Sequence, residues 1–594
     1  MDIHGADIDG IEGKIIRFEA TKEVNRKGVT LLGLASRVVK EGLIRAAKAI
    51  ETLDGNWGSS LDQQGYTIQF IPSEKPKLSA SFDLPLAIML LYASIMQSLD
   101  SLDENIKQLE KQIESDDDKK KRAKAKEKIL EKLAALNEQK QRVLKYKKRL
   151  SDNPNKYLLL GSLSIANGEL KATEHGMLGM ISSAKPGFIV IVPEESEIHG
   201  AIVQSAKEKV KVLKAKDLQE VWDIILGESK PRPVVYNRNK VKTKKQLNYV
   251  PDLSAIKGVA LGKKAMTVAL AGGHNILFVG PPGQGKTMLA KAATNLLPSL
   301  LKDEMFEVNK VMSAKGVLDA NEVVLDRPFQ EVRKDTTSAA LFGGGTKPPV
   351  PGIISLAHRG IFLIDEINLF PPALIEQLRN PLNDKTHRVQ RLQWTLDYPC
   401  DFILVAAMNP CKCGWLKHFK CPKCEKTYLD PVTVCPRDKV PLKNRCECTV
   451  SQIKRFNNLS NPLLDRIDLK VMVSEYDKEP SGYKYASQTI KSDISNARKV
   501  QKRRYDNARF GYLNASVPDE SQYEKYCPDI PLNVEKYIKD IRKEYDLTPR
   551  RAVKLLLVSR TLADLEKSRS VRKKDVDEAK EIMGLGDFYF KDLI

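Results

Sequence analysis

The spacing of apolar residues in the first part of the chain predicts a small unit of alternating strands and helices. Residues 66–71 alternate apolar and polar positions as a strand does, and short apolar runs predict further strands at 28–33, 157–165, 187–193 and 210–213. Between the first two strands the apolar positions have the spacing of a helix: Val38, Val39, Leu43, Ile44, Ala47 and Ile50. We therefore expect an α/β domain over residues 1–227, with one interruption.

The interruption, residues 98–153, contains no Gly or Pro and is rich in charge. Its apolar residues step by four, three and four from Leu102 to Ile113, and the spacing resumes from Ile129 to Leu150, with Lys140 breaking it. This pattern predicts an antiparallel coiled-coil hairpin with its bend at Asp116–Asp118, which would offer a surface for a protein partner. A single mobile charged insertion is the alternative that the short heptad runs leave open.

A strand, a Gly-rich turn and a helix follow one another at residues 275–293. This is the context that a phosphate-binding loop requires, because converging backbone N–H groups at a helix N-terminus attract phosphate oxygens. We expect the glycines to shape the turn, Lys286 to reach the β- and γ-phosphates and the Thr287 hydroxyl to hold Mg²⁺. The glycines concerned are Gly280, Gly283 and Gly285.

Two further strands end in polar residues that suit the same chemistry. The run 361–364 ends in Asp365 and Glu366, where the first acid can hold the magnesium shell and the second can polarise an attacking water. The run 402–408 ends at Asn409, which is well placed to sense a γ-phosphate. Together these motifs predict hydrolysis of ATP with Mg²⁺. The stretch 313–352 between them reads as a long loop, either facing a pore or lying passively on the surface.

Seven of the nine cysteines fall within residues 411–448. Such a density of thiols in a reducing compartment predicts structural zinc, since each tetrahedral site needs about four soft ligands. The spacing fits two sites, and the fourth ligand of the second is either Asp438 or His418. The first site would use Cys411, Cys413, Cys446 and Cys448, and the second Cys421, Cys424, Cys435 and Asp438.

Composition narrows the class of protein. Lys and Arg number 97 against 76 Asp and Glu, a net charge of +21, which favours a polyanionic partner such as nucleic acid over a merely solvated basic surface. Residues 228–250 form a basic linker, with seven positive side chains and no acid between 230 and 245. No apolar run is long enough for a membrane span and the N-terminus lacks a signal peptide, so a cytoplasmic protein without membrane contact is expected.

The chain resembles the magnesium-chelatase-like AAA+ ATPases, in particular the ComM/YifB group. The resemblance rests on motifs that occur in one order along almost the whole length: Phe82–Ala87, Ala271–Asn275 with the phosphate-binding loop, Gly343–Gly345, Ile354–His358, Ala406–Gly414, Pro462–Leu469 and Arg560–Leu565. It implies an AAA+ core over 251–475, within which the cysteine-rich residues 411–448 form the zinc-binding insertion inferred above, a helical lid over 476–594, and a homo-hexameric ring with ATP between subunits. It also implies that Arg466 is an arginine finger for the neighbouring site and that Arg550 is the second sensor. The lid cluster Arg498–Arg509 and the basic linker would bind DNA phosphates.

The N-terminal domain resembles the Lon protease domain, whose Ser–Lys dyad uses an amine to activate a hydroxyl. Ser81 falls at the serine position, but the segment 175–180 contains no lysine, so a scaffold without peptidase activity is expected. Three features depart from the usual ComM/YifB pattern: the charged interruption, the insert 421–438 and the stretch 327–337, which lacks paired histidines.

The function that the resemblance implies is a DNA helicase or branch-migration translocase in recombination or natural transformation. A chelatase-type motor and a protein-remodelling ATPase are the alternatives. A chelatase motor subunit would lack the Lon-like domain and the cysteine cluster, whereas a remodeller would hold its client with the N-terminal domain and the coiled coil.

Overall fold

The computed structural model describes residues 1–23, 27–53, 65–114, 123–207, 209–237, 242–244, 249–345, 348–391, 394–416, 418–425, 427–429, 434–456, 459–473, 486–508, 511–527 and 530–585. The chain divides into two compact units. The first unit comprises Met1–Lys244 and Met305–Val323, and the second comprises Lys245–Glu304 and Val324–Ile594. Among the described residues, no helix combines the length and the apolar character that a bilayer span requires.

The first unit is built on an eight-stranded mixed sheet in the order β10-β9-β8-β5-β1-β2-β4-β3. Two neighbouring strands inside this sheet, β1 and β2, form an antiparallel hairpin that the sequence pattern did not reveal. The strands are β1 (Asp2–Asp9), β2 (Glu12–Glu23), β3 (Gly28–Leu32), β4 (Gly65–Ile71), β5 (Lys156–Leu159), β8 (Phe188–Pro193), β9 (Lys211–Ala215) and β10 (Arg232–Pro233). The short pairs β6 (Ser162–Leu163) with β7 (Leu170–Lys171) and β11 (Lys242–Thr243) with β13 (Glu322–Val323) stand apart from it.

The first unit contains the helix and the strands that were predicted from the spacing of apolar residues. The helix expected from the apolar positions between Val38 and Ile50 is α1, and the strands expected near 28, 66, 157, 188 and 211 are present. The helices are α1 (Arg37–Glu51), α3 (Asp83–Glu114), α4 (Ala123–Ser151), α5 (Met177–Ser182), α6 (Glu197–Ala206), α7 (Leu218–Leu226) and α10 (Lys302–Lys315), whose residues from Met305 onward belong to this unit. Ser81 is fully buried, and its hydroxyl donates to the carbonyl of Ala6 at 2.8 Å.

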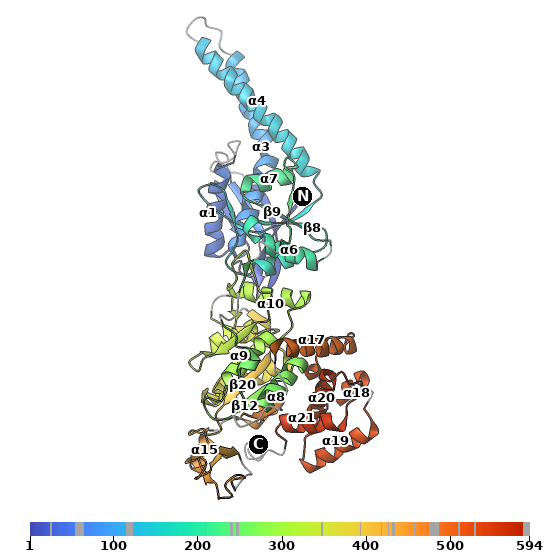
Figure 1. Cartoon of the computed structure of the whole chain (residues 1–594). Coiled ribbons are helices and arrows are strands. Elements are labelled where there is room, and N and C mark those ends of the chain that lie inside the picture. The colour runs from blue at the N-terminus through green and yellow to red at the C-terminus, as the bar shows by residue number, and fades with distance from the viewer. Residues whose placement is uncertain are drawn as a thin grey trace. The chain divides into compact units, whose positions relative to one another are not determined.

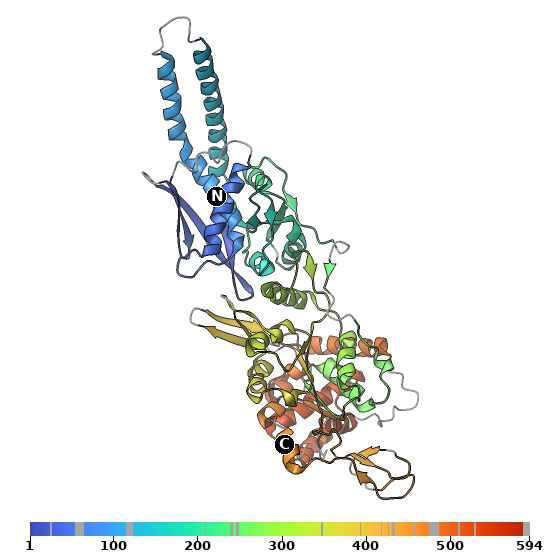
Figure 2. The ribbon, with the colours of Figure 1, turned by 90° about the vertical axis from the view of Figure 1, so that its left-hand side faces the viewer.

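Within its described residues, the charged interruption folds into two long helices, α3 and α4, that lie side by side (Figure 2). Lys140, which breaks the apolar spacing of α4, makes an ion pair with Asp103 of α3 at 2.5 Å. The expected bend at Asp116–Asp118 lies outside the described residues. The structure therefore contains a helical hairpin, and supercoiling of its two helices stays a prediction. Of the predicted apolar residues, those buried are Leu102, Ile106, Val143 and Leu150.

The second unit contains a five-stranded parallel sheet in the order β14-β17-β20-β12-β24, with helices on both faces (Figure 1). Because neighbouring residues of a strand point to opposite faces, Leu363 and Val405 join one hydrophobic core while Ile364 and Ala406 join another. The first of these cores also contains α8, α9 and the C-terminal helices. The strands are β12 (Ile276–Val279), β14 (Phe329–Val332), β17 (Ile361–Ile364), β20 (Ile403–Met408) and β24 (Leu469–Met472).

The remaining elements of the second unit are shorter or C-terminal. Thr548 caps α20 by accepting the N–H of Arg551. The helices are α8 (Ala260–Gly272), α9 (Lys286–Leu296), α11 (Ser338–Phe342), α12 (Ile353–Leu356), α13 (Pro372–Glu376), α14 (Arg379–Asp384), α15 (Val450–Phe456), α16 (Asn461–Leu464), α17 (Ser487–Arg504), α18 (Glu520–Tyr526), α19 (Leu532–Glu544), α20 (Pro549–Leu565) and α21 (Lys573–Ile582). The small strands are β15 (Gly343–Gly344), β16 (Val350–Pro351), β18 (Thr386–Arg391), β19 (Trp394–Pro399), β21 (His418–Lys420), β22 (Thr427–Leu429) and β23 (Lys443–Asn444).

The interpretation of residues 313–352 as one long loop is wrong. The segment contains β14, which pairs in parallel with β17 and completes the sheet, and it also contains α11 and the small strands β15 and β16. The strand is only four residues long and carries Gln330 and Glu331 at its centre, so the apolar pattern did not reveal it. Met305–Val323 instead groups with the first unit, where β13 pairs with β11 of the basic linker.

Several basic residues that were expected to meet phosphate are engaged within the protein. Arg498 is buried and donates twice to the carbonyl of Leu270 near the C-terminus of α8, at 2.9 and 2.6 Å, and burial lowers the pKa of Arg498 to about 10. Arg504 pairs with the buried Asp564 at 2.5 Å. In the linker, Arg232 pairs with Glu220 at 2.6 Å. The prediction of phosphate contact is therefore wrong for the buried Arg498, whereas Arg504 and Arg232 would have to exchange a carboxylate partner for phosphate.

Candidate functional site

The Gly-rich turn connects the end of β12 to the start of α9 in the second unit. Gly283 and Gly285 have φ of +81° and +75°, values that side chains with a Cβ rarely adopt. A Cβ on Gly280 would lie 2.3 Å from the carbonyl oxygen of Val473, so only glycine fits beside the neighbouring strand. The turn thus has the backbone that a phosphate-binding loop needs, at the carboxyl end of a central parallel strand.

Lys286 is the first residue of α9, and its amine is held at the carboxyl edge of the sheet. Its Nζ donates to the carbonyls of Gly280 at 2.7 Å and Pro281 at 2.8 Å and to Oδ1 of Asn409 at 3.1 Å. Burial lowers the pKa of Lys286 to about 8, although Asp365 and Glu366 oppose the change. A buried ammonium group attracts an anion more strongly than neutral carbonyl and amide oxygens, so a phosphate oxygen could replace these partners.

The expected magnesium residues also meet. The hydroxyl of Thr287 donates to Oδ2 of Asp365 at 2.6 Å, and the backbone N–H of Glu366 donates to Oδ1 of the same carboxylate at 2.9 Å. Glu366 has φ of +50° and an exposed side chain. Three adjacent strands, β17, β20 and β12, therefore bring together at one end of the sheet five residues from three segments that are far apart in sequence.

Arg466 and Arg550 lie elsewhere in the second unit, close to each other. Arg466 donates to the carbonyl of Pro462, and its Nε is buried and has no hydrogen-bond partner among the described residues. Arg550 donates to Oδ1 of Asn383 at 2.7 Å. Burial, Arg550 and Arg379 all lower the pKa of Arg466, which places three guanidinium groups in one neighbourhood. Sequence reasoning missed Arg379, because no motif distinguishes it from an ordinary surface arginine.

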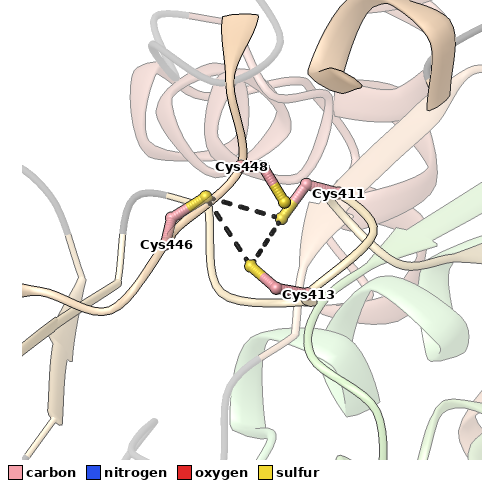
Figure 3. Close-up of side chains that lie close together, drawn as sticks. All are labelled: Cys411, Cys413, Cys446 and Cys448. Carbon is pink, nitrogen blue, oxygen red and sulfur yellow. Dashed lines mark hydrogen bonds between the residues drawn. The ribbon is translucent and has the colours of Figure 1, made fainter.

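Four cysteines meet directly after β20, as their spacing predicted (Figure 3). The sulfur of Cys411 lies 3.3 Å from that of Cys413 and 3.7 Å from that of Cys446, and Cys413 lies 3.7 Å from Cys446. A tetrahedral zinc ion with Zn–S bonds of about 2.3 Å would separate two sulfurs by about 3.8 Å, whereas a disulfide bond measures about 2.05 Å. With Cys448 completing the set, the donors fit a four-thiolate metal site.

The second group consists of two turns of the same construction. In the first, the N–H of Cys424 donates to the sulfur of Cys421 at 3.5 Å, and Glu425 follows with φ of +58°. In the second, the N–H of Asp438 donates to the sulfur of Cys435 at 3.3 Å, and Lys439 follows with φ of +54°. Asp438 therefore occupies in one turn the position that Cys424 occupies in the other.

The distances in this second group also suit a metal. Oδ2 of Asp438 lies 3.4 Å from the sulfurs of both Cys421 and Cys435, and a tetrahedral zinc ion would separate a sulfur from an oxygen ligand by about 3.5 Å. His418, the alternative fourth ligand, has its Nδ1 2.9 Å from the carbonyl of Leu416 and its ring against Trp415. The structure thus groups Asp438, and not His418, with the three thiols.

The four-cysteine cluster lies directly against the phosphate-binding loop. Gly414, next to Cys413, is buried with φ of +82°, and a Cβ there would lie 2.5 Å from Cδ of Pro282. Cys411 also follows Asn409, the partner of Lys286, by only two residues. The cluster is therefore positioned to set the conformation of both the loop and the strand end that carries Asn409.

Comparison with known proteins bears on the same residues. The family model described as "Magnesium chelatase, subunit ChlI" matches residues 252–433 and 431–480, "Magnesium chelatase, subunit ChlI C-terminal" matches 484–582, and "Subunit ChlI of Mg-chelatase" matches 18–110. The chain is 28% identical over 592 residues to uncharacterized protein YifB of Escherichia coli, covering 97% of this chain and 96% of that protein. It is 27% identical over 587 residues to competence protein ComM of Haemophilus influenzae, covering 96% and 94%.

The chain belongs to the ComM/YifB group of the magnesium-chelatase-like family. Its similarity to a chelatase subunit is narrower: the magnesium-chelatase 67 kDa subunit of Heliobacterium mobile is 28% identical over 201 residues, which cover 29% of this chain and 30% of that protein. The parallel sheet of the second unit is consistent with the AAA+ fold of this family, and the family supports an AAA+ ATPase. The Lon-like character of the first unit stays a prediction.

Proposed function

We propose that this protein is an ATP-driven ring motor that acts on DNA, as a translocase or branch-migration helicase. The observation that carries the ATPase part is the convergence of Lys286, Thr287, Asp365 and Asn409 at one sheet edge. The proposal that the motor acts on DNA rests on the basic composition, with 97 Lys and Arg against 76 Asp and Glu, and on the similarity to a competence protein.

Each residue of this edge then has a defined task. Lys286 exchanges the carbonyls of Gly280 and Pro281 for β- and γ-phosphate oxygens of ATP, and Asn409 keeps contact with its amine. Thr287 and Asp365 hold Mg²⁺, which supplies neutralisation of the charge on these phosphates. Glu366 accepts a hydrogen bond from the attacking water and polarises it.

Hydrolysis also requires positive charge on the transferring phosphoryl group, and this charge comes from a second copy of the chain. Arg466 and Arg550 contact Pro462 and Asn383 of their own chain, and no described residue of the phosphate-binding loop is among their hydrogen-bond partners. A homo-hexameric ring would place both arginines at the ATP of the neighbouring subunit, so that hydrolysis depends on assembly.

The two cysteine groups hold zinc, and their role is structural. Cys411, Cys413, Cys446 and Cys448 would bind one ion, and Cys421, Cys424, Cys435 and Asp438 a second. Four protein ligands leave no open coordination position, so neither ion would contact substrate. The first ion would instead hold the segment that supports Pro282 of the phosphate-binding loop.

The test is the ATPase rate of the wild-type protein with and without single-stranded DNA, with oligomer size measured in parallel. We expect DNA to stimulate hydrolysis, and we expect DNA binding to weaken steeply with salt, by about −0.7 in the log–log slope for each phosphate neutralised on a single strand. Arg466→Ala should assemble and bind DNA but lose the stimulated hydrolysis. A rate that responds to unfolded protein and not to DNA would favour a remodeller, and a rate that responds only to partner subunits would favour a chelatase-type motor.

A further inference from the structure

Helix α14 lies between two parts of the second unit, the start of α20 with Arg550 and the segment that carries Arg466. Arg379 and Asn383 stand four residues apart on this helix and therefore share a face. Asn383 accepts a hydrogen bond from Nη2 of Arg550, at the start of α20, at 2.7 Å. The contact places the Arg550 guanidinium beside the helix face that carries Arg379.

A second set of contacts links Arg379 to the segment of Arg466. Nη1 of Arg379 donates to Oε2 of Glu376 at 3.2 Å, and the other oxygen of this carboxylate accepts from the hydroxyl of Ser460. Ser460 caps α16, the short helix that ends just before Arg466. Glu376 thus ties the Arg379 guanidinium to the element that positions Arg466.

The charges in this neighbourhood do not balance within one chain. Three guanidinium groups share it, and the nearby Asp465 faces a further arginine, Arg551, at 3.5 Å. The side chain of Arg379 is 40% exposed, and the Nε of Arg466 is buried without a hydrogen-bond partner in the part of the chain that the structure describes. A buried donor and crowded like charges cost free energy unless an anion is present. Guanidinium forks match the oxygens of phosphate, which makes phosphate the anion that suits the cluster.

We propose that Arg379 contacts the triphosphate of ATP bound to a second copy of this chain, as a third arginine beside Arg466 and Arg550. The proposal rests on the proposed function, since it assumes a nucleotide between subunits. Glu376 holds the Arg379 guanidinium in the orientation in which its free N–H groups face that nucleotide, and α14 fixes its spacing from Arg550.

The first test is Arg379→Ala in the full-length protein. Because a charge-assisted hydrogen bond to phosphate is lost, kcat of the ATPase should fall about 10- to 100-fold. Binding of nucleotide to the protein's own loop should persist. Arg37→Ala is the matched control, since Arg37, like Arg379, pairs with a glutamate that is close in sequence, Glu41 at 2.8 Å, but lies in the first unit. Arg379→Lys, which keeps the charge and loses the fork, should recover part of the rate and guards against an effect of misfolding.

Mixed rings decide whether Arg379 acts on its own site or on its neighbour's. In a mixture of Arg379→Ala with Lys286→Ala, about a quarter of randomly formed interfaces combine an intact loop from one chain with an intact Arg379 from the other. Hydrolysis should therefore rise well above the mean of the two separate variants. No rise, while Arg466→Ala mixed with Lys286→Ala does rise, would overturn the proposal.

The possible results distinguish a failure of the proposed role of Arg379 from a failure of the proposed function. If the wild-type protein neither assembles nor hydrolyses ATP, the proposed function is refuted, and the role of Arg379 is refuted with it. A wild-type protein that does both, together with an Arg379→Ala variant of unchanged kcat, would overturn the role of Arg379 alone.

Discussion

Gly414→Ala tests whether the four-cysteine cluster sets the conformation of the phosphate-binding loop. The substitution removes no thiol and changes no charge. The new Cβ would lie 2.5 Å from Cδ of Pro282, whereas carbon atoms in contact are about 3.5–4.0 Å apart, so one of the two must retreat by about 1 Å. Gly414 is buried beside Cys413 while Pro282 is exposed, so the loop is the part that moves.

A displacement of about 1 Å in an element that positions substrate can cost about 100-fold, so we expect nucleotide affinity to fall about 10- to 100-fold. Alanine at φ of +82° also costs about 1–2 kcal/mol of folding stability. Gly227→Ala isolates this second effect, because Gly227 has φ of +69° and a Cβ there would have no atom of a described residue within 4 Å. Gly227 lies in the first unit, at the end of α7.

The assay is titration of each protein with a fluorescent ATP analogue, with zinc content and melting temperature measured on the same preparations. Gly414→Ala should bind nucleotide weakly and retain its metal, whereas Gly227→Ala should lose stability alone. Unchanged affinity in a folded, metal-loaded Gly414→Ala protein would refute the reasoning. Equal loss of affinity in both variants would refute it too, because the effect would then be a general loss of stability.

Three further predictions concern single groups. Glu366→Gln should bind ATP normally and stop turnover, since the water loses its polarising carboxylate; hydrolysis at the wild-type rate would show that another group does this work. Nucleotide affinity should fall as pH rises from about 8 to about 10, because the pKa of Lys286 is lowered to about 8 and only the protonated amine attracts phosphate; a flat affinity profile between these values would contradict it. Cys421→Ser should remove one zinc ion by metal analysis and leave ATP affinity intact, whereas Cys411→Ser should reduce both; Cys400→Ala, a buried cysteine outside both groups, is the control.

Local sequence determined the parts of the site that depend on neighbouring residues. The order strand, Gly-rich turn, helix placed Lys286 at a helix start, and the phosphate-binding turn followed from it. Cysteine spacing was equally informative, because two ligands within three or four residues must lie close whatever the rest of the chain does. Helical periodicity likewise predicted α1 and the two helices of the hairpin.

The tertiary structure decided which charged side chains are paired or buried within the protein and which remain available to a ligand. Arg498 and Arg504 belong to a basic cluster in the sequence, but packing of α17 against α8 and α20 buries Arg498 against a helix C-terminus and pairs Arg504 with an aspartate. Conversely, Arg379 carried no signal, and it gained its proposed role because α14 lies beside Arg550 and the cap of α16. Burial and pairing depend on segments that are remote in sequence, and one-dimensional patterns record the charge of a residue but not what folds against it.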